Sequence, residues 1–562
     1  MQLGLRQWPS HEKITSGARV NIRKFFNASP KHYFIAAFSG LLLTFCFPPI
    51  GHPLVGWAVL VPLLFLATTN KPYVCFTLGW FAGVCHGLSL LYWITYVVNH
   101  YGNLPLPVSL VVCFLLVAYL ALFPGLFCAG LSWLRQRGLP WLPLAPFLWV
   151  TLELGKSHLL TGFPWENLGY SQYRWLPSIQ MADLAGVYGI SFVLALSSAL
   201  LFRMIFGSKH QKTKVTPLIS TLLLVGLVSV VYGYGRWRLA TSESHQDQSF
   251  KVAMVQGNVS QDTKWDPAFQ QATLEKYVRL TNEIAKQQPD LVVWPETATP
   301  FYFLADRQNT KTLIQEVQKL KKPLLFGSPA YRRKGEELRL YNRAYLLDGD
   351  GMVTGYYDKI HLVPFGEYVP WKKILFFVDK LVQAAGNFAS GKHARVLEVS
   401  AARVGVLICY EVIFPKLSRD LANGGANLLV NITNDAWFGR SSAPHQHLSM
   451  AVLRAVENRI PIARCANTGI SAFIDNRGRI LQKTRLYENA TLVATLQLGN
   501  GKTIYTRYGD WFAWLCVATT LLVFGYSLTR IRSKETGVRR KKTGRIVSDK
   551  GTVQTAQIMI HY

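Results

Sequence analysis

The chain has 562 residues, half of them hydrophobic and 16% charged, and its 60 basic against 31 acidic side chains give a formal net charge of +29. This composition excludes a disordered, collagen-like or small disulfide-bonded protein. A mean hydropathy of +0.17 at so high a net charge requires apolar and basic residues to occupy different parts of the chain, as they do in a membrane protein.

Eight apolar segments, each long enough or nearly long enough to cross a bilayer as a helix, follow a basic N-terminal tail at 1–32. We expect transmembrane helices at 33–49, 53–69, 73–96, 106–133, 141–157, 180–206 and 215–234, and an eighth at 511–529. The first two are short and separated by a proline-rich segment, so a single helical hairpin is the alternative. The fold class expected for 33–234 is a seven-helix membrane bundle, which the helix at 511–529 completes.

Lysine and arginine residues are distributed unevenly among the loops. With the N-terminus inside, the segments expected in the cytoplasm carry 22 of them, and the short loops expected outside carry two. Because basic residues near helix ends are retained in the cytoplasm, this predicts an extracytoplasmic domain at 235–510 and a basic cytoplasmic tail at 530–562. The densest basic runs flank apolar segments, which favours anionic lipid over nucleic acid as their partner.

The polar domain at 235–510 alternates segments rich in Val, Ile and Leu with helical patterns, which is typical of a sheet covered by helices. Strands are predicted at 251–259, 290–294, 324–328, 343–347, 402–409, 427–433, 468–475 and 492–498, and helices at 267–288, 306–320, 412–423 and 445–458. Turns between strands are predicted at 348–351 and 476–478. The domain holds two of the eight cysteines and no CxxC motif, so we expect neither a zinc site nor a disulfide framework.

Three chemically reactive side chains stand at or beside predicted strand ends. Glu296 follows a buried strand and a proline, Lys359 lies in an otherwise apolar loop, and Cys409 ends a strand. Taken singly, they are explained as a surface acid, a solvated charge and a small buried hydrophobe. Together they form a complete acyl-transfer site, since a thiol needs a base to become a nucleophile and an ammonium can stabilise the oxyanion of a tetrahedral intermediate.

Four further polar residues have two interpretations each. Glu153 and Asp183 lie in or near apolar helices, where ionisable groups are often functional, but both also fit interfacial positions at helix ends. His445 and His447 are two residues apart, which is compatible with a metal site. Because no carboxylate or cysteine cluster lies near them in the sequence, we favour hydrogen-bonded residues at a helix start and expect no metal or other cofactor.

The sequence around these residues resembles the nitrilase superfamily, and more closely its membrane branch, the apolipoprotein N-acyltransferases. The segments that carry the resemblance are 255–259 (VQGNV), 294–297 (WPET), 359–370 (KIHLVPFGEYVP), 409–411 (CYE), 434–439 (NDAWFG), 444–447 (PHQH) and, in a membrane loop, 161–165 (TGFPW) and 168–172 (LGYSQ). They indicate a resemblance over about residues 33–530, with the basic tails outside it. It implies a four-layer α-β-β-α sandwich for the domain at 235–510.

The resemblance also implies a role for each site residue. Glu296 is then the general base, Lys359 the oxyanion stabiliser and Cys409 the nucleophile. Supporting roles fall to Glu367, Tyr410 and Glu411, and Trp265 lies on a mobile arm near the entrance, although simple packing explains a tryptophan there equally well. We also expect Trp437 and Phe438 to shield an acyl chain from water.

The implied function is transfer of a fatty acyl chain from a phospholipid, through a Cys409 thioester, to the α-amino group of the diacylglyceryl-cysteine of an apolipoprotein. We expect a monomeric ping-pong enzyme of the bacterial inner membrane, with its catalytic domain on the periplasmic side. One alternative is a membrane-anchored amidase that uses water as acceptor, although one anchor would then suffice. The other is a transporter or receptor with an inactive nitrilase-like domain, which the intact triad disfavours.

Overall fold

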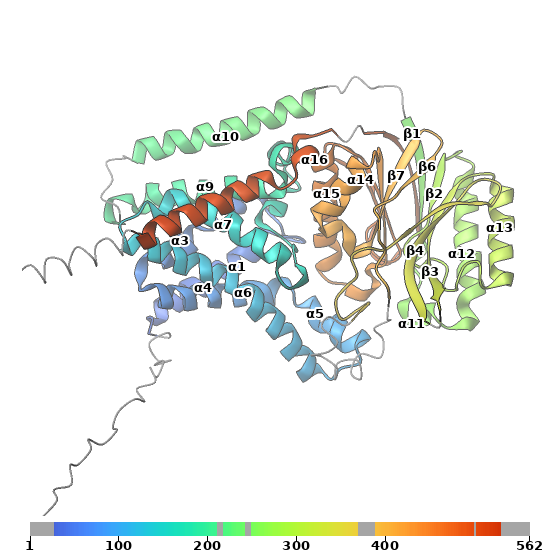
Figure 1. Ribbon diagram of the computed structural model, residues 1–562, viewed down its shortest axis with the longest axis horizontal. Coiled ribbons are helices and arrows are strands. Elements are labelled where there is room, and N and C mark those ends of the chain that lie inside the picture. Colours follow the sequence, from blue (N-terminus) through green and yellow to red (C-terminus); the bar gives the residue numbers. More distant parts are fainter. Residues whose placement is uncertain are drawn as a thin grey trace, which may run out of the picture.

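The computed structural model describes residues 27–210, 217–241, 249–335, 337–368, 388–499 and 502–529. A bundle of helices occupies one end of the molecule and a pair of β-sheets with flanking helices occupies the other (Figure 1). Residues 1–26 of the basic N-terminal tail and the whole tail expected at 530–562 lie outside the described residues.

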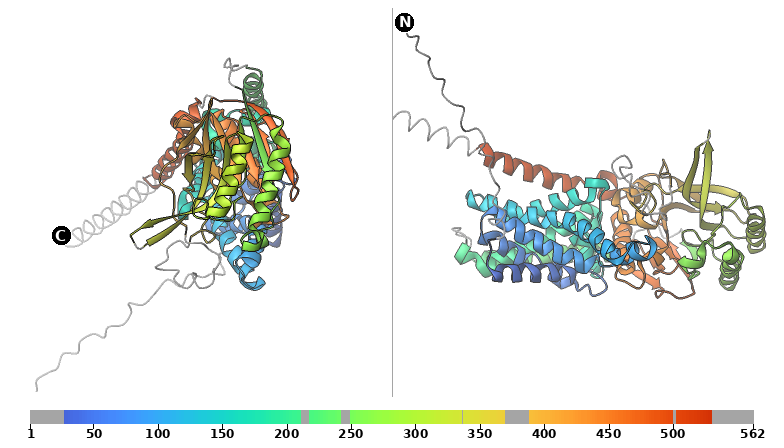
Figure 2. Two further views of the ribbon diagram at one scale, coloured as in Figure 1. Left: turned by 90° about the vertical axis from the view of Figure 1, so that its right-hand side faces the viewer. Right: turned by 90° about the horizontal axis from the view of Figure 1, so that it is seen from below.

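The helical end contains a helix at each of the eight expected positions. Its elements are α1 (Pro30–Thr44), α2 (Pro53–Gly56), α3 (Val61–Thr69), α4 (Pro72–Leu90), α5 (Trp93–Tyr96), the π-helical segment η2 (Val97–Tyr101), α6 (Leu106–Gln136), α7 (Trp141–His158), the 3-10 turns η3 (Leu159–Thr161) and η4 (Leu168–Gln172), α8 (Leu176–Ile179), α9 (Ala182–His210), α10 (Pro217–Ala240) and a last helix at Trp511–Thr529. The last helix returns along the bundle beside α9 and α7 (Figures 1 and 2).

Within the described residues, five helices rather than eight are long and apolar enough to cross a membrane: α4, α6, α9, α10 and Trp511–Thr529. The count of eight was too high for physical reasons that differ between segments. α1 has 15 residues and ends before Pro48, and the segment from Pro53 to Thr69 is divided into α2 and α3. α7 has 18 residues, but Glu153 and Lys156 lower its hydropathy.

The other end of the molecule contains two six-stranded mixed sheets. The first has the order β12-β1-β2-β3-β4-β5, and the second β11-β10-β9-β8-β7-β6. The strands are β1 (Ser249–Gln256), β2 (Leu291–Val293), β3 (Leu324–Lys334), β4 (Glu337–Leu347), β5 (Val353–Asp358), β6 (Val396–Val399), β7 (Ala402–Ile408), β8 (Leu428–Thr433), β9 (Ile462–Ala466), β10 (Ala472–Ile474), β11 (Ile480–Lys483) and β12 (Ala490–Gln497). β1, β2 and β3 run parallel, as do β7, β8 and β9, and both predicted turns connect antiparallel neighbours.

The sheets pack face to face because alternate side chains of each strand point to opposite faces. In β1, Val252 and Met254 belong to the core between the two sheets, whereas Ala253 and Val255 belong to the core beneath α12 (Pro267–Ala285) and α13 (Arg307–Leu320). On the far side, α14 (Pro415–Asn423) and α15 (Ala443–Asn458) cover the second sheet. The expected α-β-β-α sandwich is confirmed.

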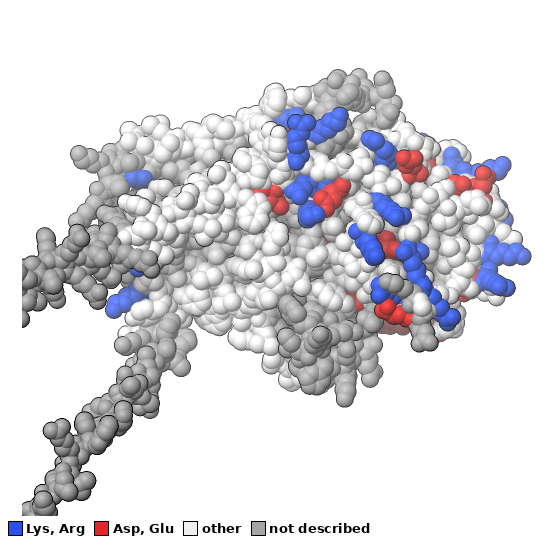
Figure 3. All heavy atoms as spheres, viewed as in Figure 1, with Lys and Arg blue, Asp and Glu red and all other residues white. Residues whose placement is uncertain are grey.

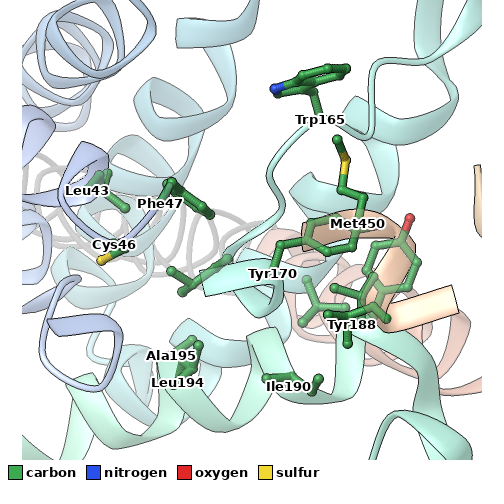
Figure 4. Packing of buried hydrophobic residues seen from close by; sticks show 14 of the residues in the cluster. Leu43, Cys46, Phe47, Trp165, Tyr170, Tyr188, Ile190, Leu194, Ala195 and Met450 are labelled. Atoms are coloured by element: carbon green, nitrogen blue, oxygen red, sulfur yellow. The ribbon is translucent and has the colours of Figure 1, made fainter. Parts of the chain in front are cut away.

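The α15 layer joins the sandwich to the helical bundle. Met450 of α15 packs in one continuous core with Tyr170 and Tyr188 of the bundle (Figure 4). Beside this core, the Arg459 guanidinium donates to Asp183 Oδ2 at 2.7 Å, so the carboxylate of Asp183, in the first turn of α9, is buried in a contact between the two parts. The sheets are thereby held at a fixed place relative to the membrane helices.

Charged side chains gather on the sandwich, while the visible surface of the bundle is almost free of them (Figure 3). The exposed large hydrophobic residues include a run on α6 and another on α10, among them Leu115 and Leu222. A large exposed apolar surface of this kind is favourable in contact with lipid hydrocarbon and unfavourable in contact with water. The segregation of apolar and basic residues seen in the sequence is therefore also a segregation in space, and the bundle is the membrane-embedded part.

Candidate active site

Three buried side chains meet where strands of the two sheets end. Glu296 lies three residues beyond β2, Lys359 directly follows β5, and Cys409 directly follows β7 as the first residue of the 3-10 helix η6 (Cys409–Ile413). Glu296 is 5% exposed, Lys359 1% and Cys409 7%. The structure brings together the three residues that sequence reasoning selected.

The Lys359 ammonium lies between two carboxylates. Its Nζ atom is 2.9 Å from Glu367 Oε1 and 3.6 Å from Glu296 Oε1. Burial opposes a charge on Lys359, but the carboxylates of Glu367 and Glu296 outweigh it and raise the pKa of the ammonium above its ordinary value. Lys359 therefore stays charged at neutral pH, as a group that stabilises an oxyanion must be.

Both oxygens of Glu296 accept a hydrogen bond from the protein. Asn342 Nδ2 donates to Oε1 at 2.7 Å, and the backbone N–H of Asn434 donates to Oε2 at 2.8 Å. Asn342 also donates to Glu367 Oε1 at 3.0 Å, so one amide fixes the two carboxylates relative to each other. The Glu296 carboxylate is thus held in one orientation beside the lysine.

The Cys409 thiol is electrostatically disfavoured as a thiolate. Burial, together with the negative charge of Glu296, raises the pKa of the thiol far above its ordinary value, and Lys359 opposes this only in part. The resting group is therefore a neutral thiol, and a thiol must lose its proton before it can act as a nucleophile. The backbone at Cys409 has a φ of 53°, a left-handed conformation that costs about 1–2 kcal/mol for a non-glycine residue and recurs at functional sites.

A buried polar network holds the backbone of Cys409 from behind. His447 Nε2 lies 3.2 Å from the Cys409 carbonyl oxygen, and His447 Nδ1 is 3.1 Å from both Asp435 Oδ1 and Arg464 Nη2. Burial and the Arg464 charge lower the pKa of His447, so the ring is neutral. A neutral ring that accepts from Arg464 at Nδ1 carries its proton on Nε2 and donates to the Cys409 carbonyl. His447 is then a hydrogen-bonded residue near the start of α15, as the sequence suggested.

Glu411 accepts four hydrogen bonds although it is fully buried. Its Oε1 atom accepts from the backbone N–H groups of Ile360 at 2.6 Å and His361 at 3.1 Å and from the Tyr357 hydroxyl at 2.9 Å, and its Oε2 atom accepts from Ile408 N at 2.7 Å. Burial raises the pKa of Glu411 to about 7. Because Ile360 follows Lys359 and Ile408 precedes Cys409, this carboxylate joins the two chain segments. Tyr410 instead packs on Phe414, with ring centroids 5.2 Å apart.

Sequence reasoning missed Lys264, the last residue of the one-turn helix α11 (Gln261–Lys264). Its Nζ atom donates to the Glu296 carbonyl oxygen at 3.2 Å and to Thr297 Oγ1 at 2.5 Å. Burial lowers the pKa of Lys264 to about 8, against the opposing influence of Glu296 and Cys409. One helical turn away, Gln261 Oε1 accepts from Asn434 Nδ2 at 2.6 Å, so α11 contacts the segments on both sides of the Glu296 carboxylate.

Two of the three residues expected at the entrance contact α5 and the π-helical segment η2, and the third follows a helix that contacts η2. Trp437 stacks edge to face on Tyr101 at 4.8 Å, and Phe438 on Trp93 at 4.9 Å. Trp265 is 47% exposed and follows α11, whose Asp262 lies 3.6 Å from His100 of η2. π-Helical segments are rare and are frequent at functional sites. Trp437 and Phe438 thus border the junction between the membrane helices and the sandwich, and Trp265 lies three residues from Asp262.

Two protein-family models match the chain. The model described as carbon-nitrogen hydrolase matches residues 251–505, and the model described as apolipoprotein N-acyltransferase N-terminal domain matches residues 39–200. The first range covers the sandwich, and the second lies within the helical bundle.

Curated relatives match over nearly their whole length. A protein of Geobacter metallireducens named apolipoprotein N-acyltransferase is 46% identical over 507 residues, which are 90% of this chain and 97% of the relative. Proteins with the same name from Allorhizobium ampelinum and Methylococcus capsulatus are 31% and 33% identical and cover 91% and 86% of the chain. Among solved structures, an amidase from Nesterenkonia sp. covers 48% of the chain at 21% identity with a TM-score of 0.36.

Proposed function

Because the chain belongs to the apolipoprotein N-acyltransferase family, we propose that it takes a fatty acyl chain from a phospholipid and passes it to the α-amino group of a diacylglyceryl-cysteine on an apolipoprotein. The observation that carries this proposal is the convergence of Glu296, Lys359 and Cys409 in a sandwich that is docked on a membrane bundle. A site placed in this way meets phospholipid as its most abundant ester.

In the first half-reaction the Cys409 sulfur attacks the carbonyl carbon of a phospholipid ester. Glu296 takes the thiol proton as the C–S bond forms, and the Lys359 ammonium stabilises the negative charge on the carbonyl oxygen. When the tetrahedral intermediate collapses, the C–O bond breaks and Glu296 returns the proton to the leaving alkoxide. The products are a lysophospholipid and a thioester on Cys409. The high pKa of the buried thiol makes the base indispensable.

In the second half-reaction the neutral α-amine of the acceptor attacks the thioester carbon. Glu296 takes a proton from the nitrogen, the C–S bond breaks, and the Cys409 sulfur leaves as a thiol with that proton. An α-amino group has a pKa of about 7.7–8, so much of the acceptor is neutral at physiological pH. The two half-reactions make the enzyme a ping-pong catalyst that returns to its starting state.

The thioester must be kept from water, because hydrolysis would waste the acyl chain. We assign this role to Trp437 and Phe438, and their packing against rings of the membrane segment at 93–101 supports the assignment. We place the enzyme in the bacterial inner membrane as a monomer, with the sandwich on the periplasmic side. The charge asymmetry of the loops supports this orientation.

The experiment that tests the proposal is intact-mass measurement of the detergent-purified full chain after incubation with phosphatidylethanolamine. The wild type should gain the mass of one fatty acyl group, a diacylglyceryl-cysteinyl peptide should remove it, and Cys409→Ala should gain nothing. An adduct that forms but decays at the same rate with and without the peptide would instead identify a lipid hydrolase. Well-folded wild type that forms no adduct with any phospholipid would refute the phospholipid donor.

A further inference from the structure

A cavity of about 420 Å³ lies between the membrane segment and the sandwich, and it shares the entrance residue Phe438 with the site described above. One wall comes from the segment at 92–96 and the other from the end of the 3-10 helix η7 (Asp435–Phe438) and the chain that follows it. The lining residues are Tyr92, Trp93 and Tyr96 on the first wall, Phe438, Gly439, Arg440 and Ser441 on the second, and Tyr487. Tyrosine and tryptophan are the residues enriched at the level of lipid headgroups.

The apolar wall of this cavity is connected to the backbone of Cys409 through His447. Phe438 packs on Trp93 at 4.9 Å and against the His447 ring at 6.1 Å, and His447 Nε2 contacts the Cys409 carbonyl at 3.2 Å. Gly439 approaches Tyr96 so closely that a Cβ atom there would lie 2.8 Å from the tyrosine ring, which keeps the two walls together. A lipid seated in the cavity would therefore be near the acyl-transfer site.

Arg440 is the cation of the cavity. Its guanidinium lies over the Tyr487 ring, 4.7 Å from the ring centroid, and the side chain is exposed. In the part of the chain that the structure describes, no carboxylate lies within 4 Å of this guanidinium. The buried arginines of the sandwich, by contrast, are paired: Arg464 with Asp435 at 2.7 Å and Arg459 with Asp183 at 2.7 Å.

From these features we infer that the cavity binds the phosphodiester of the phospholipid donor, with Arg440 as its ligand; the inference rests on the function proposed above. A guanidinium presents a planar array of N–H donors that matches phosphate oxygens. Tyr487 holds the guanidinium by a cation–π contact, and the Ser441 hydroxyl on the same wall can donate as well. The aromatic side of the cavity faces the glycerol and acyl part of the lipid.

This arrangement predicts which lipids the enzyme accepts as acyl donors. The phosphodiester carries one negative charge whether the headgroup is ethanolamine or glycerol, so the site should recognise the phosphate and not the headgroup beyond it. A phosphate-free diacylglycerol has the same ester but nothing for Arg440 to bind. The enzyme should therefore accept different phospholipids and discriminate against diacylglycerol.

The test measures the first half-reaction alone, as the rate of acyl adduct formation in mixed detergent micelles. Donors are phosphatidylethanolamine, phosphatidylglycerol and diacylglycerol, and the variants are Arg440→Gln and Arg440→Lys. Arg333→Gln is the matched control, since Arg333 is exposed on β3. Arg440→Gln should raise the half-saturating concentration of both phospholipids about tenfold, the loss of one charged hydrogen bond. Its maximal rate and its rate with diacylglycerol should not change, and Arg440→Lys should recover part of the loss.

Each other outcome overturns the inference. An equal loss on diacylglycerol would mean that Arg440 shapes the entrance, and no change on any donor would place the phosphate elsewhere. A slower discharge of preformed thioester by the diacylglyceryl-cysteinyl peptide would assign Arg440 to the acceptor. Protection of Arg440 by inorganic phosphate from modification with phenylglyoxal, without an effect of Arg440→Gln on lipid, would indicate a site for soluble anions. Failure of the proposed function is distinguishable, because wild type would then form no adduct at all.

Discussion

The side chain of Lys264 donates a hydrogen bond to the backbone carbonyl oxygen of Glu296 at 3.2 Å. The lysine is buried, and it stands one residue before the exposed Trp265. α11 is thus tied to the residue proposed as the general base, while the next residue faces the entrance. A substrate that moves this arm would move a charge next to the base.

The pH dependence of acyl transfer should reveal this lysine. Burial lowers the pKa of Lys264 to about 8, so its positive charge is present below pH 8 and is lost as the pH rises through that value. Because Glu296 and Cys409 both interact with that charge, acyl adduct formation should decline on the alkaline side with a midpoint near pH 8. The measurement is the rate of acyl adduct formation with phosphatidylethanolamine in reactions run from pH 6 to about 10, stopped at set times and analysed by intact mass.

Two variants test whether Lys264 is the group whose titration causes the alkaline decline. Lys264→Arg keeps the charge at all these pH values and should lose the alkaline decline. Lys264→Met should be slow throughout and show no decline either. Lys359 and Cys409 cannot produce a midpoint near pH 8, because the pKa of each is raised above its ordinary value. A decline at pH 8 that persists in both variants would show that another group titrates.

Glu367 should matter through Lys359. Its Oε1 atom is 2.9 Å from the ammonium, closer than Glu296 Oε1 at 3.6 Å, so Glu367 draws the lysine away from the base. Glu367→Gln keeps the shape and removes the charge. The lysine should then pair with Glu296, and acyl adduct formation should slow about 10–100-fold, the range expected for a displaced catalytic group. The thermal unfolding midpoint, measured in the same detergent, should fall only slightly. An unchanged rate would remove Glu367 from the site.

Gly327 of β3 is required by a close approach of backbone to Glu296. A Cβ atom placed on Gly327 would lie 2.4 Å from the Thr297 nitrogen and 2.7 Å from Glu296 Cα. Backbone atoms cannot yield as a flexible side chain can, so Gly327→Ala should displace Glu296 and destabilise the domain by about 1–3 kcal/mol. The acylation rate and the unfolding midpoint should both decrease. Gly226→Ala, where nothing lies within 4 Å of the added atom, is the control that should change neither.

The sequence predicted the strands whose residues are mostly apolar and missed those whose apolar pattern is weak. β7 and β8 were found because most of their residues are Val, Leu or Ile, whereas β9 was missed because Ile462 is its only residue of that kind and Arg464 stands at its centre. Only the folded structure supplies the Asp435 carboxylate that makes this buried guanidinium acceptable. β5, β6 and β11 were missed because they lie at sheet edges, where partly exposed residues weaken the alternation of apolar and polar side chains.

The candidate site was predictable from motifs but its supporting residues were not. Glu296, Lys359 and Cys409 stand in distinctive local sequences, and the fold brings them together. Lys264 and Asn342 stand in segments whose local sequence is polar, so nothing in it indicates that they are buried. Their burial depends on contacts with residues more than 30 positions away. One signal was available for Asn342: it directly precedes the strand predicted at 343–347, and the amide of an asparagine must be satisfied if it is buried.

His447 should position the nucleophile without touching substrate. Its Nε2–H donates to the carbonyl of Cys409, whose φ of 53° needs such support, while its ring stacks on Trp165 at 5.8 Å. His447→Phe keeps a ring for the stacking but leaves the carbonyl without this donor, which costs about 1–3 kcal/mol. The rate of acyl adduct formation should fall at least about tenfold, with the half-saturating lipid concentration unchanged. His447→Gln has an amide that can donate, so it should recover part of the rate although it removes the ring. A better rate in the phenylalanine variant than in the glutamine variant would show that stacking, and not the hydrogen bond, is what Cys409 requires.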